Sequence, residues 1–262
     1  MRLIADFANV RNALVCHRTC GTICTVLTIQ SQSFPTEVAM ADFVQQRKNM
    51  VESQVRPSDI TDRRIIRAML ETPREQFVPA NLKPMAYMDE DVALAKPTPG
   101  VEPRSLLAPR TLAKMIQLAQ IDSKDVVLDV GCGTGYSAAL LGKLAETVVA
   151  LESDTGLAET ATKVLSELSF DNVAVVTGEL TNGYPDEGPY DAIFIGGRSE
   201  QMPAGLLDQL KDGGRLIAIR GQPMYSVVVL WRRVGATFDE QEEFEAGAPL
   251  LPGFAKEPTF VF

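Results

Sequence analysis

Short apolar runs alternate with amphipathic segments through the second half of the chain. The runs are VVLDV, TVVALE, NVAVVT, DAIFIG and GRLIAIR, and they lie between residues 126 and 220. Because each run is apolar at consecutive positions, we expect strands that are buried on both faces. Helical spacing at about 136–145, 155–168 and 203–210 predicts helices between them. The pattern therefore predicts an α/β fold with a mostly parallel sheet and helices on both faces.

The segments after Gly221 have a different pattern. SVVVLWRRV at 226–234 and TFVF at 259–262 have the composition of strands, and we expect them to pair at the edge of the sheet. DEQEEFE at 239–245 is strongly acidic, which predicts a solvated loop between strands.

Helical and proline-rich segments precede the predicted sheet. Met40 opens a segment with helical spacing, and a second such segment at 62–70 is ended by Pro73. Seven prolines from residue 73 to residue 109 predict irregular structure that lies over the sheet domain. Pro109 stands where a helix begins. The predicted division is a helical and proline-rich cover at 40–108 and a sheet domain at 109–262.

Residues 1–39 carry few charges and hold three of the four cysteines and the only histidine. We expect a disordered N-terminal extension, or the product of a start site upstream of the true start at Met40. Three other interpretations stay open. They are a cleaved targeting peptide, a metal site in CHRTCGTIC, whose spacing matches no familiar zinc site, and a disulfide in an exported chain.

Composition narrows the classes of partner. The 262 residues are 45% hydrophobic and 23% charged, which suits one main domain with a sizeable core. The net charge of −9 and the lack of a basic stretch argue against nucleic acid and favour a small molecule or a protein. No apolar run reaches the roughly 20 residues that span a bilayer. We therefore expect a soluble, cytoplasmic protein.

Histidine is missing from the chain after His17, and Cys132 is the only thiol after Cys24. A Ser/His/Asp triad, a histidine-bound zinc and a histidine base are therefore excluded from the main domain. Cys132 lies inside a glycine-rich turn, where a small buried residue is a better interpretation than a nucleophile.

The glycine-rich turn follows the first predicted strand in VVLDVGCGTGYSAALL, residues 126–141. Such a turn lets the backbone approach a ligand closely at the carboxyl ends of parallel strands, so a nucleotide-like ligand is expected. Gly131, Gly133 and Gly135 alternate, and Tyr136 takes the place of the last glycine of a nicotinamide fingerprint. The turn therefore indicates a nucleotide-like ligand other than a nicotinamide dinucleotide.

Acidic residues follow or end the neighbouring strands. Asp129 precedes the turn and is placed to meet an amine or another cation. Glu152 ends the second strand, where a carboxylate accepts hydrogen bonds from two ribose hydroxyls. Gly178 and Glu179 end the third strand, where the rim of an adenine pocket is expected.

The blocks LDVGCGTG, ALES, VTGE, YDAIFIGG and DGGRLIAI resemble the class I S-adenosylmethionine-dependent methyltransferases over residues 108–220. The resemblance implies a Rossmann-like, seven-stranded sheet with S-adenosyl-L-methionine across the strand tips. It places Asp129 near the methionine amine and Glu152 on the ribose. The cofactor-binding set implied is Asp129, Gly131, Cys132, Gly133, Gly135, Glu152, Gly178 and Glu179.

The flanking sequence resembles a narrower family. MVESQVRPSDITDRRIIRAMLETPREQFVP at 50–79 is similar to protein-L-isoaspartate O-methyltransferases, which repair damaged aspartyl and asparaginyl sites by methylating the isoaspartyl carboxylate. The resemblance implies a protein or peptide substrate. A carboxylate, with a reference pKa near about 4, is deprotonated at neutral pH, so its methylation requires alignment and desolvation but no base.

The loop before Pro109 departs from this family. The family pattern is G-x-G-Q-T-I-S-x-P, and this chain has VEPRSLLAP. Val101 and Pro103 replace the glycines, Arg104 replaces the glutamine and Leu107 replaces the serine. The side chain of leucine cannot donate a hydrogen bond, and proline lacks the backbone N–H donor.

Two hypotheses follow from this loop. In the first, the protein is a methyltransferase of the isoaspartyl repair type or a near relative that acts on a protein carboxylate, with Ser105 as the remaining candidate catalytic hydroxyl. Such an enzyme could also have moved to another acceptor, with Arg104 or Arg110 attracting its anionic group. In the second, it is a catalytically impaired methyltransferase fold that serves as an accessory or assembly subunit of a larger protein complex.

Overall fold

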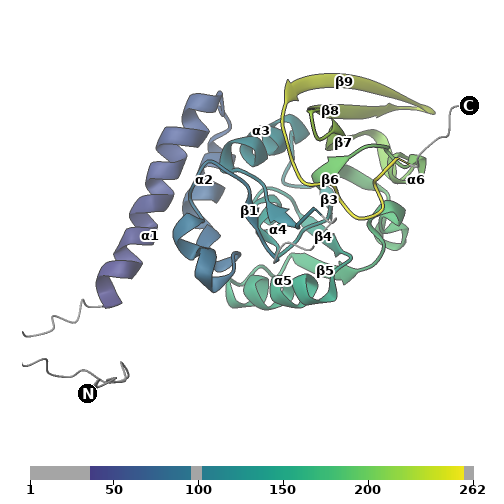
Figure 1. Cartoon of the computed structure of the whole chain (residues 1–262). Helices are drawn as coiled ribbons and strands as arrows, with labels where there is room; N and C mark the ends of the chain where they lie inside the picture. The colour runs from purple at the N-terminus through teal and green to yellow at the C-terminus, as the bar shows by residue number, and fades with distance from the viewer. Residues whose placement is uncertain (1–35, 96–101, 257–262) are drawn as a thin grey trace, which may run out of the picture. The chain divides into compact units, whose positions relative to one another are not determined.

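The computed structural model describes residues 36–95 and 102–256 (Figure 1). Most of the expected N-terminal extension, Val101 and the predicted strand at 259–262 therefore lie outside the described residues. The chain divides into two compact units between Ala41 and Asp42, and the site described below belongs to the second unit.

The N-terminal segments form the helices that their spacing predicts. Helix α1 (Thr36–Met50) continues into a π-helical turn, η1 (Val51–Val55). Asp62 caps helix α2 (Arg63–Glu71), because its side chain accepts a hydrogen bond from the backbone N–H of Arg64. A short turn of 3-10 helix, η2 (Arg56–Ser58), lies between η1 and α2. The proline-rich stretch after α2 contains η3 (Arg74–Gln76), η4 (Ala80–Met85), β1 (Val92–Ala93) and β2 (Ser105–Leu106).

A seven-stranded sheet has the order β5-β4-β3-β6-β7-β8-β9. The first five strands of this order are parallel, and β8 and β9 are added as antiparallel hairpins. The prediction of a mostly parallel, Rossmann-like sheet is therefore confirmed. The strands are β3 (Val126–Val130), β4 (Thr147–Glu152), β5 (Val173–Thr177), β6 (Tyr190–Ser199), β7 (Leu210–Gln222), β8 (Tyr225–Val234) and β9 (Thr237–Glu245).

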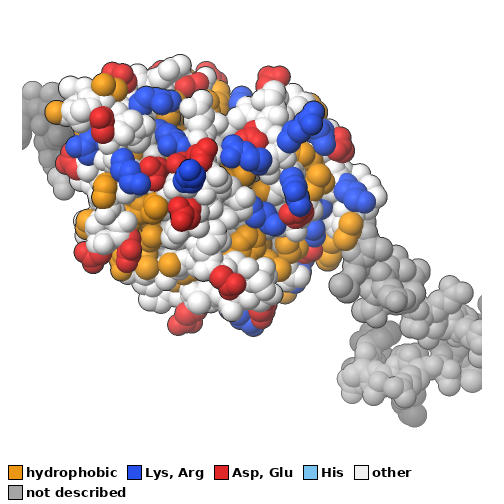
Figure 2. Space-filling view, turned by 180° about the vertical axis from the view of Figure 1, so that it is seen from behind, with side chains coloured by type: hydrophobic (Ala, Val, Ile, Leu, Met, Phe, Trp, Pro, Cys, Tyr) orange, Lys and Arg blue, Asp and Glu red, His pale blue; other side chains and the backbone are white. Residues whose placement is uncertain are grey.

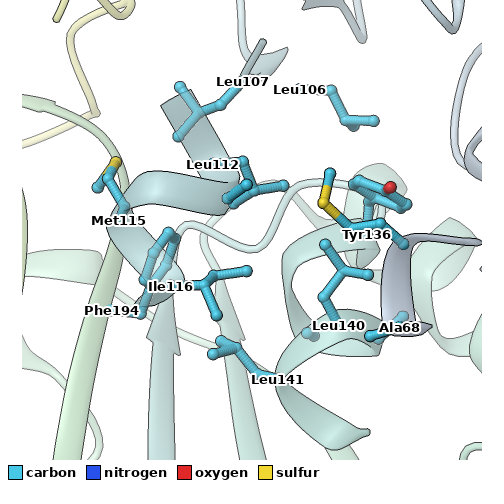
Figure 3. Packing of buried hydrophobic residues seen from close by; sticks show 14 of the residues in the cluster. Ala68, Leu106, Leu107, Leu112, Met115, Ile116, Tyr136, Leu140, Leu141 and Phe194 are labelled. Atoms are coloured by element: carbon cyan, nitrogen blue, oxygen red, sulfur yellow. The ribbon is translucent and has the colours of Figure 1, made fainter. Parts of the chain in front are cut away.

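Two hydrophobic clusters fill the two faces of this sheet, as expected for strands that are apolar at consecutive positions. Helices α3 (Pro109–Ala119), α4 (Tyr136–Gly142) and α5 (Thr155–Glu167) pack into the first cluster, part of which is shown in Figure 3. Helix α6 (Ala204–Leu207) contributes Leu206 to the second cluster. Helices therefore lie on both faces.

Two sequence predictions are wrong in detail. The acidic segment 239–245 is part of edge strand β9, not a loop. Its carboxylates face solvent or meet β7 and β8: Glu240 accepts a hydrogen bond from Trp231 Nε1 and pairs with Arg220. Charge on an edge strand protects the open edge from pairing with other chains, so acidity here does not exclude a strand. The helix expected at 203–210 is a single turn, because β7 begins at Leu210.

The surface carries charges of both signs. Figure 2 shows Lys and Arg side chains interspersed with Asp and Glu side chains across one face. Among the helices of the described residues, none combines the length and the apolar character that a membrane crossing requires.

Candidate functional site

The glycine-rich turn connects β3 to α4. Gly131, Gly133 and Gly135 have φ angles of 78°, 58° and 94°, a region that residues with a Cβ atom rarely adopt. The N–H groups of Gly131 and Cys132 donate to the carbonyl oxygen of Leu151 at 2.8 and 3.2 Å. These bonds hold the turn against the end of β4, so that the ends of the two strands form one site.

Asp129 supplies a buried carboxylate below this turn. Its Oδ2 accepts a hydrogen bond of 2.6 Å from the Ser137 hydroxyl in the first turn of α4. Its Oδ1 has no partner among the described residues although the side chain is completely buried. Burial, helped by the charge of Glu152, raises the pKa of Asp129 to about 7. A buried carboxylate oxygen without a donor is suited to a ligand that brings an ammonium group.

Glu152 is the second buried carboxylate, at the end of β4. Backbone N–H groups of Gly133, Ser153 and Asp154 donate to it at 2.8, 2.8 and 3.1 Å. Arg104 adds a bidentate ion pair, with Nη1 and Nη2 each 2.8 Å from a different carboxylate oxygen. The same Nη2 lies 2.9 Å from the carbonyl oxygen of Gly131. Both oxygens of Glu152 are therefore fully engaged by this chain's own donors.

A small pocket lies between the turn, the loop that carries Arg104 and the end of β6. Its free volume is about 20 Å³, which holds little more than one water molecule. The pocket is lined by Ser105, Leu106, Leu107, Leu112, Gly131, Cys132, Tyr136, Ser137, Phe194 and Gly196.

The divergent loop contributes apolar side chains to this pocket. Leu106 and Leu107 are buried and lie over Leu112 and Tyr136 (Figure 3). The carbonyl oxygen of Leu107 accepts a hydrogen bond of 2.9 Å from Nη2 of the buried Arg74, which fixes the loop from below. Leu107 is therefore a packed core residue as well as a lining residue.

The remaining candidates have varied surroundings. The Ser105 hydroxyl donates to the carbonyl oxygen of Pro103 at 3.3 Å. Gly178 follows β5 and donates its N–H to the backbone carbonyl of Glu152 at 3.0 Å, and Glu179 is exposed beside it. Arg110 is exposed, pairs with Asp89 at 3.5 Å and does not line the pocket.

Cys132 is part of the turn and is buried. Burial, together with the charges of Asp129 and Glu152, raises the pKa of its thiol well above the usual range. A thiol that stays protonated is a poor nucleophile, which agrees with its interpretation as a small buried residue.

Several residues that shape the site carry no signal in the sequence. Leu94 beside β1 lies over Gly133, where an added Cβ would be 2.6 Å from Leu94 Cδ1. Leu251 lies over Gly131 in the same way, with its Cδ2 atom 3.1 Å from an added Cβ. Both residues come from irregular segments far from the turn in sequence, and single apolar residues in such segments carry no periodic signal.

A buried arginine holds the same loop from the other side. Arg198 on β6 donates to Glu102 at 2.6 Å, and Glu102 also accepts the N–H of Leu250 at 2.7 Å. This contact joins the start of the loop to the segment that follows β9.

Among these residues that were not predicted, Ser137 alone could have been found from its position in the glycine motif, because it lies in the first helical turn after the glycines.

Comparison with known proteins places these features in a family. Residues 45–239 match the model of the protein-L-isoaspartate(D-aspartate) O-methyltransferase family. A protein-L-isoaspartate O-methyltransferase of Methanoculleus marisnigri is 40% identical over 191 residues, which cover 72% of this chain and 84% of the relative. One from Roseiflexus castenholzii is 34% identical over 215 residues, which cover 82% and 95%.

Solved structures give the same result. A protein-L-isoaspartate O-methyltransferase structure superposes with a TM-score of 0.71 at 25% identity, covering 79% of this chain and 66% of the other. A Plasmodium falciparum structure, described as a protein-L-isoaspartate O-methyltransferase in complex with S-adenosyl-L-homocysteine, has a TM-score of 0.64 at 19% identity, covering 80% and 97%. The second likeness supports the fold.

Proposed function

Because the chain belongs to the protein-L-isoaspartate(D-aspartate) O-methyltransferase family, we propose that it transfers a methyl group from S-adenosyl-L-methionine to isoaspartyl carboxylates in proteins. The family match supports the reaction, and the site supports the ligands. The observation that carries most weight is the free Oδ1 of Asp129, a buried acceptor beside a glycine turn.

The residues present fit this cofactor. Asp129 would hold its ammonium group, the glycine turn would pass under it, and Glu152 would accept its ribose hydroxyls once Arg104 moves. Gly178 and Glu179 stand beside the end of β4, where the adenine would lie. When bound, the cofactor supplies an electrophilic methyl group on a positively charged sulfur.

The chain's own residues provide alignment and desolvation. The acceptor carboxylate is already ionised at neutral pH, so no protein group needs to remove a proton. Leu106, Leu107 and Phe194 line the pocket and exclude water from it. A carboxylate that loses its hydration shell while it is held in line is a better nucleophile.

The experiment that tests this function is a labelled methyl transfer followed by location of the label. An isoaspartyl peptide is incubated with the protein and labelled S-adenosyl-L-methionine, and the product is treated with mild base. We expect label on the peptide that is released by base, as for a carboxyl methyl ester. Asp129→Asn and Glu152→Gln should each abolish transfer. Base-stable label would assign a different acceptor.

The loop favours one alternative, a methyltransferase fold that acts as an accessory subunit of a complex. Leu107 stands where the family has a hydroxyl, and Arg104 engages Glu152. Cofactor binding without methyl transfer, together with a stoichiometric partner on purification, would support this alternative.

A further inference from the structure

Arg104 holds the position on Glu152 that a ribose needs. A carboxylate offers about four acceptor positions. Those of Glu152 already receive two guanidinium N–H groups and three backbone N–H groups. The backbone groups belong to the turn and the strand end and stay in place. A ligand that binds Glu152 through hydroxyls must therefore displace Arg104.

The backbone around Arg104 is anchored, so the side chain is the part that can move. Its carbonyl oxygen accepts the N–H of Leu94 at 2.7 Å beside the antiparallel pair of β1 and β2. Two residues earlier, Glu102 is held by Arg198 and by the N–H of Leu250. The guanidinium already contacts the Gly131 carbonyl. Gly131 lines the pocket, and so does Ser105, which follows Arg104 in the sequence. A rotation of the side chain therefore brings its charge to the pocket.

A displaced Arg104 would lack an anionic partner among the residues that line the pocket. Where it pairs with Glu152, its side chain is only 12% exposed and therefore poorly hydrated. The ten residues that line the pocket include no aspartate or glutamate. A partly buried guanidinium is stabilised by a carboxylate that accepts two of its N–H groups. The acceptor of the proposed reaction brings such a carboxylate.

We propose that Arg104 alternates between two carboxylates: it pairs with Glu152 before the cofactor binds and with the isoaspartyl carboxylate afterwards. This inference rests on the proposed function. It gives the loop a substitute for the hydroxyl that Leu107 lacks, because the charge of Arg104 positions the acceptor. Arg104 is then a residue that couples cofactor binding to acceptor binding.

The same exchange favours product release. In the transfer, the methyl–sulfur bond breaks as the methyl–oxygen bond forms, and the sulfur keeps the electron pair. The acceptor anion becomes a neutral ester, so Arg104 loses its partner in the pocket. The return of Arg104 to Glu152 then competes with the ribose of the product.

Titration calorimetry with S-adenosyl-L-homocysteine tests the displacement of Arg104 from Glu152 without any turnover. Arg104→Gln removes the competing charge, and we expect it to bind this ligand about fivefold to tenfold more tightly than the wild type. Arg104→Lys, which cannot form the bidentate pair, should lie between them. Arg67→Gln, which loses an exposed arginine paired with Glu71, is the matched control and should not change binding. Equal or weaker binding by Arg104→Gln would overturn the displacement.

The pairing of Arg104 with the isoaspartyl carboxylate is tested by adding an isoaspartyl peptide to the same titration. In the wild type, saturating peptide should tighten binding of S-adenosyl-L-homocysteine by about fivefold, and this coupling should disappear in Arg104→Gln. At saturating cofactor, Arg104→Gln should raise the KM for the peptide about tenfold, with partial rescue by Arg104→Lys. An unchanged KM for the peptide, or retained coupling between peptide and cofactor binding, in Arg104→Gln would overturn the pairing of Arg104 with the isoaspartyl carboxylate.

Failure of the proposed function can be distinguished from failure of the proposed role of Arg104. If the wild type methylates no isoaspartyl peptide, the proposed function and the pairing of Arg104 with the isoaspartyl carboxylate fall together. The displacement of Arg104 from Glu152 is then still decided by the titration with S-adenosyl-L-homocysteine alone.

Discussion

Ser137 and Asp129 share one hydrogen bond of 2.6 Å, and it leaves the second oxygen of Asp129 without a donor. The carboxylate is completely buried, and its pKa is raised to about 7. The site thus keeps a poorly stabilised charge that a ligand's ammonium group can pair with.

Cofactor binding should depend on pH near neutrality. Below about pH 7 Asp129 is protonated before the ligand binds, so the ammonium group loses its anionic partner. We expect the Kd of S-adenosyl-L-homocysteine to rise towards about tenfold per pH unit below that value and to be flat above it. Calorimetry at pH 6, 7 and 8 measures this change. Asp129→Asn should bind weakly at all three pH values, and a wild-type Kd that stays constant would contradict the role of Asp129.

The same carboxylate should lower the stability of the ligand-free protein at high pH. Its folded pKa lies above its unfolded value of 3.8, so the folded state binds more protons between the two values. The free energy of unfolding therefore falls as pH rises from about 4 to about 7. Asp129→Asn removes this penalty and should raise Tm at pH 8 more than at pH 5. Thermal scans at both pH values test this, and an equal shift at both would contradict it.

Much of this fold could be predicted because its signals are local. Consecutive apolar positions indicated β3, β4 and β6, and alternate glycines marked the turn between β3 and α4. Strand β9 was missed because its side chains are mostly charged, and its assignment depends on pairing with β8. Pairing across a sheet edge leaves little trace in the pattern of one strand.

The site itself could be predicted only in part. Asp129 lies in β3, Glu152 ends β4 and the glycines follow β3, so their positions follow from the motif. The contact between Arg104 and Glu152 joins residues 48 positions apart through an irregular loop. No periodicity fixes the path of such a loop, so the sequence indicated only that Arg104 could attract an anionic group and did not indicate its pairing with Glu152.

The glycine turn should not tolerate a side chain at Gly133. A Cβ there would meet Leu94 Cδ1 at 2.6 Å, and φ is 58°. Gly235 has a φ of 60° and open space around it, so Gly235→Ala measures the backbone strain alone, about 1–2 kcal/mol. Gly133→Ala should lose at least as much stability and should also lose most binding of S-adenosyl-L-homocysteine. Equal affinities for the two variants would contradict the placement of the ligand over this turn.

Restoring a hydroxyl at Leu107 should not improve the enzyme. Leu107 is packed in the core, so Leu107→Ser should cost about 2–5 kcal/mol of unfolding free energy, as for other truncations of buried leucines. If Arg104 positions the acceptor, the KM for an isoaspartyl peptide should not fall. Leu107→Ala reports the cavity alone. A higher kcat/KM for Leu107→Ser than for both Leu107→Ala and the wild type would show that the hydroxyl is the missing group.

The most direct measurement compares labelled methyl transfer to two peptides that differ only in the linkage of one aspartyl residue. We expect transfer to the isoaspartyl peptide and none above background to the normal aspartyl peptide, with loss of transfer in Asp129→Asn. Protein that binds S-adenosyl-L-homocysteine but methylates neither peptide, or both equally, would contradict the proposed function.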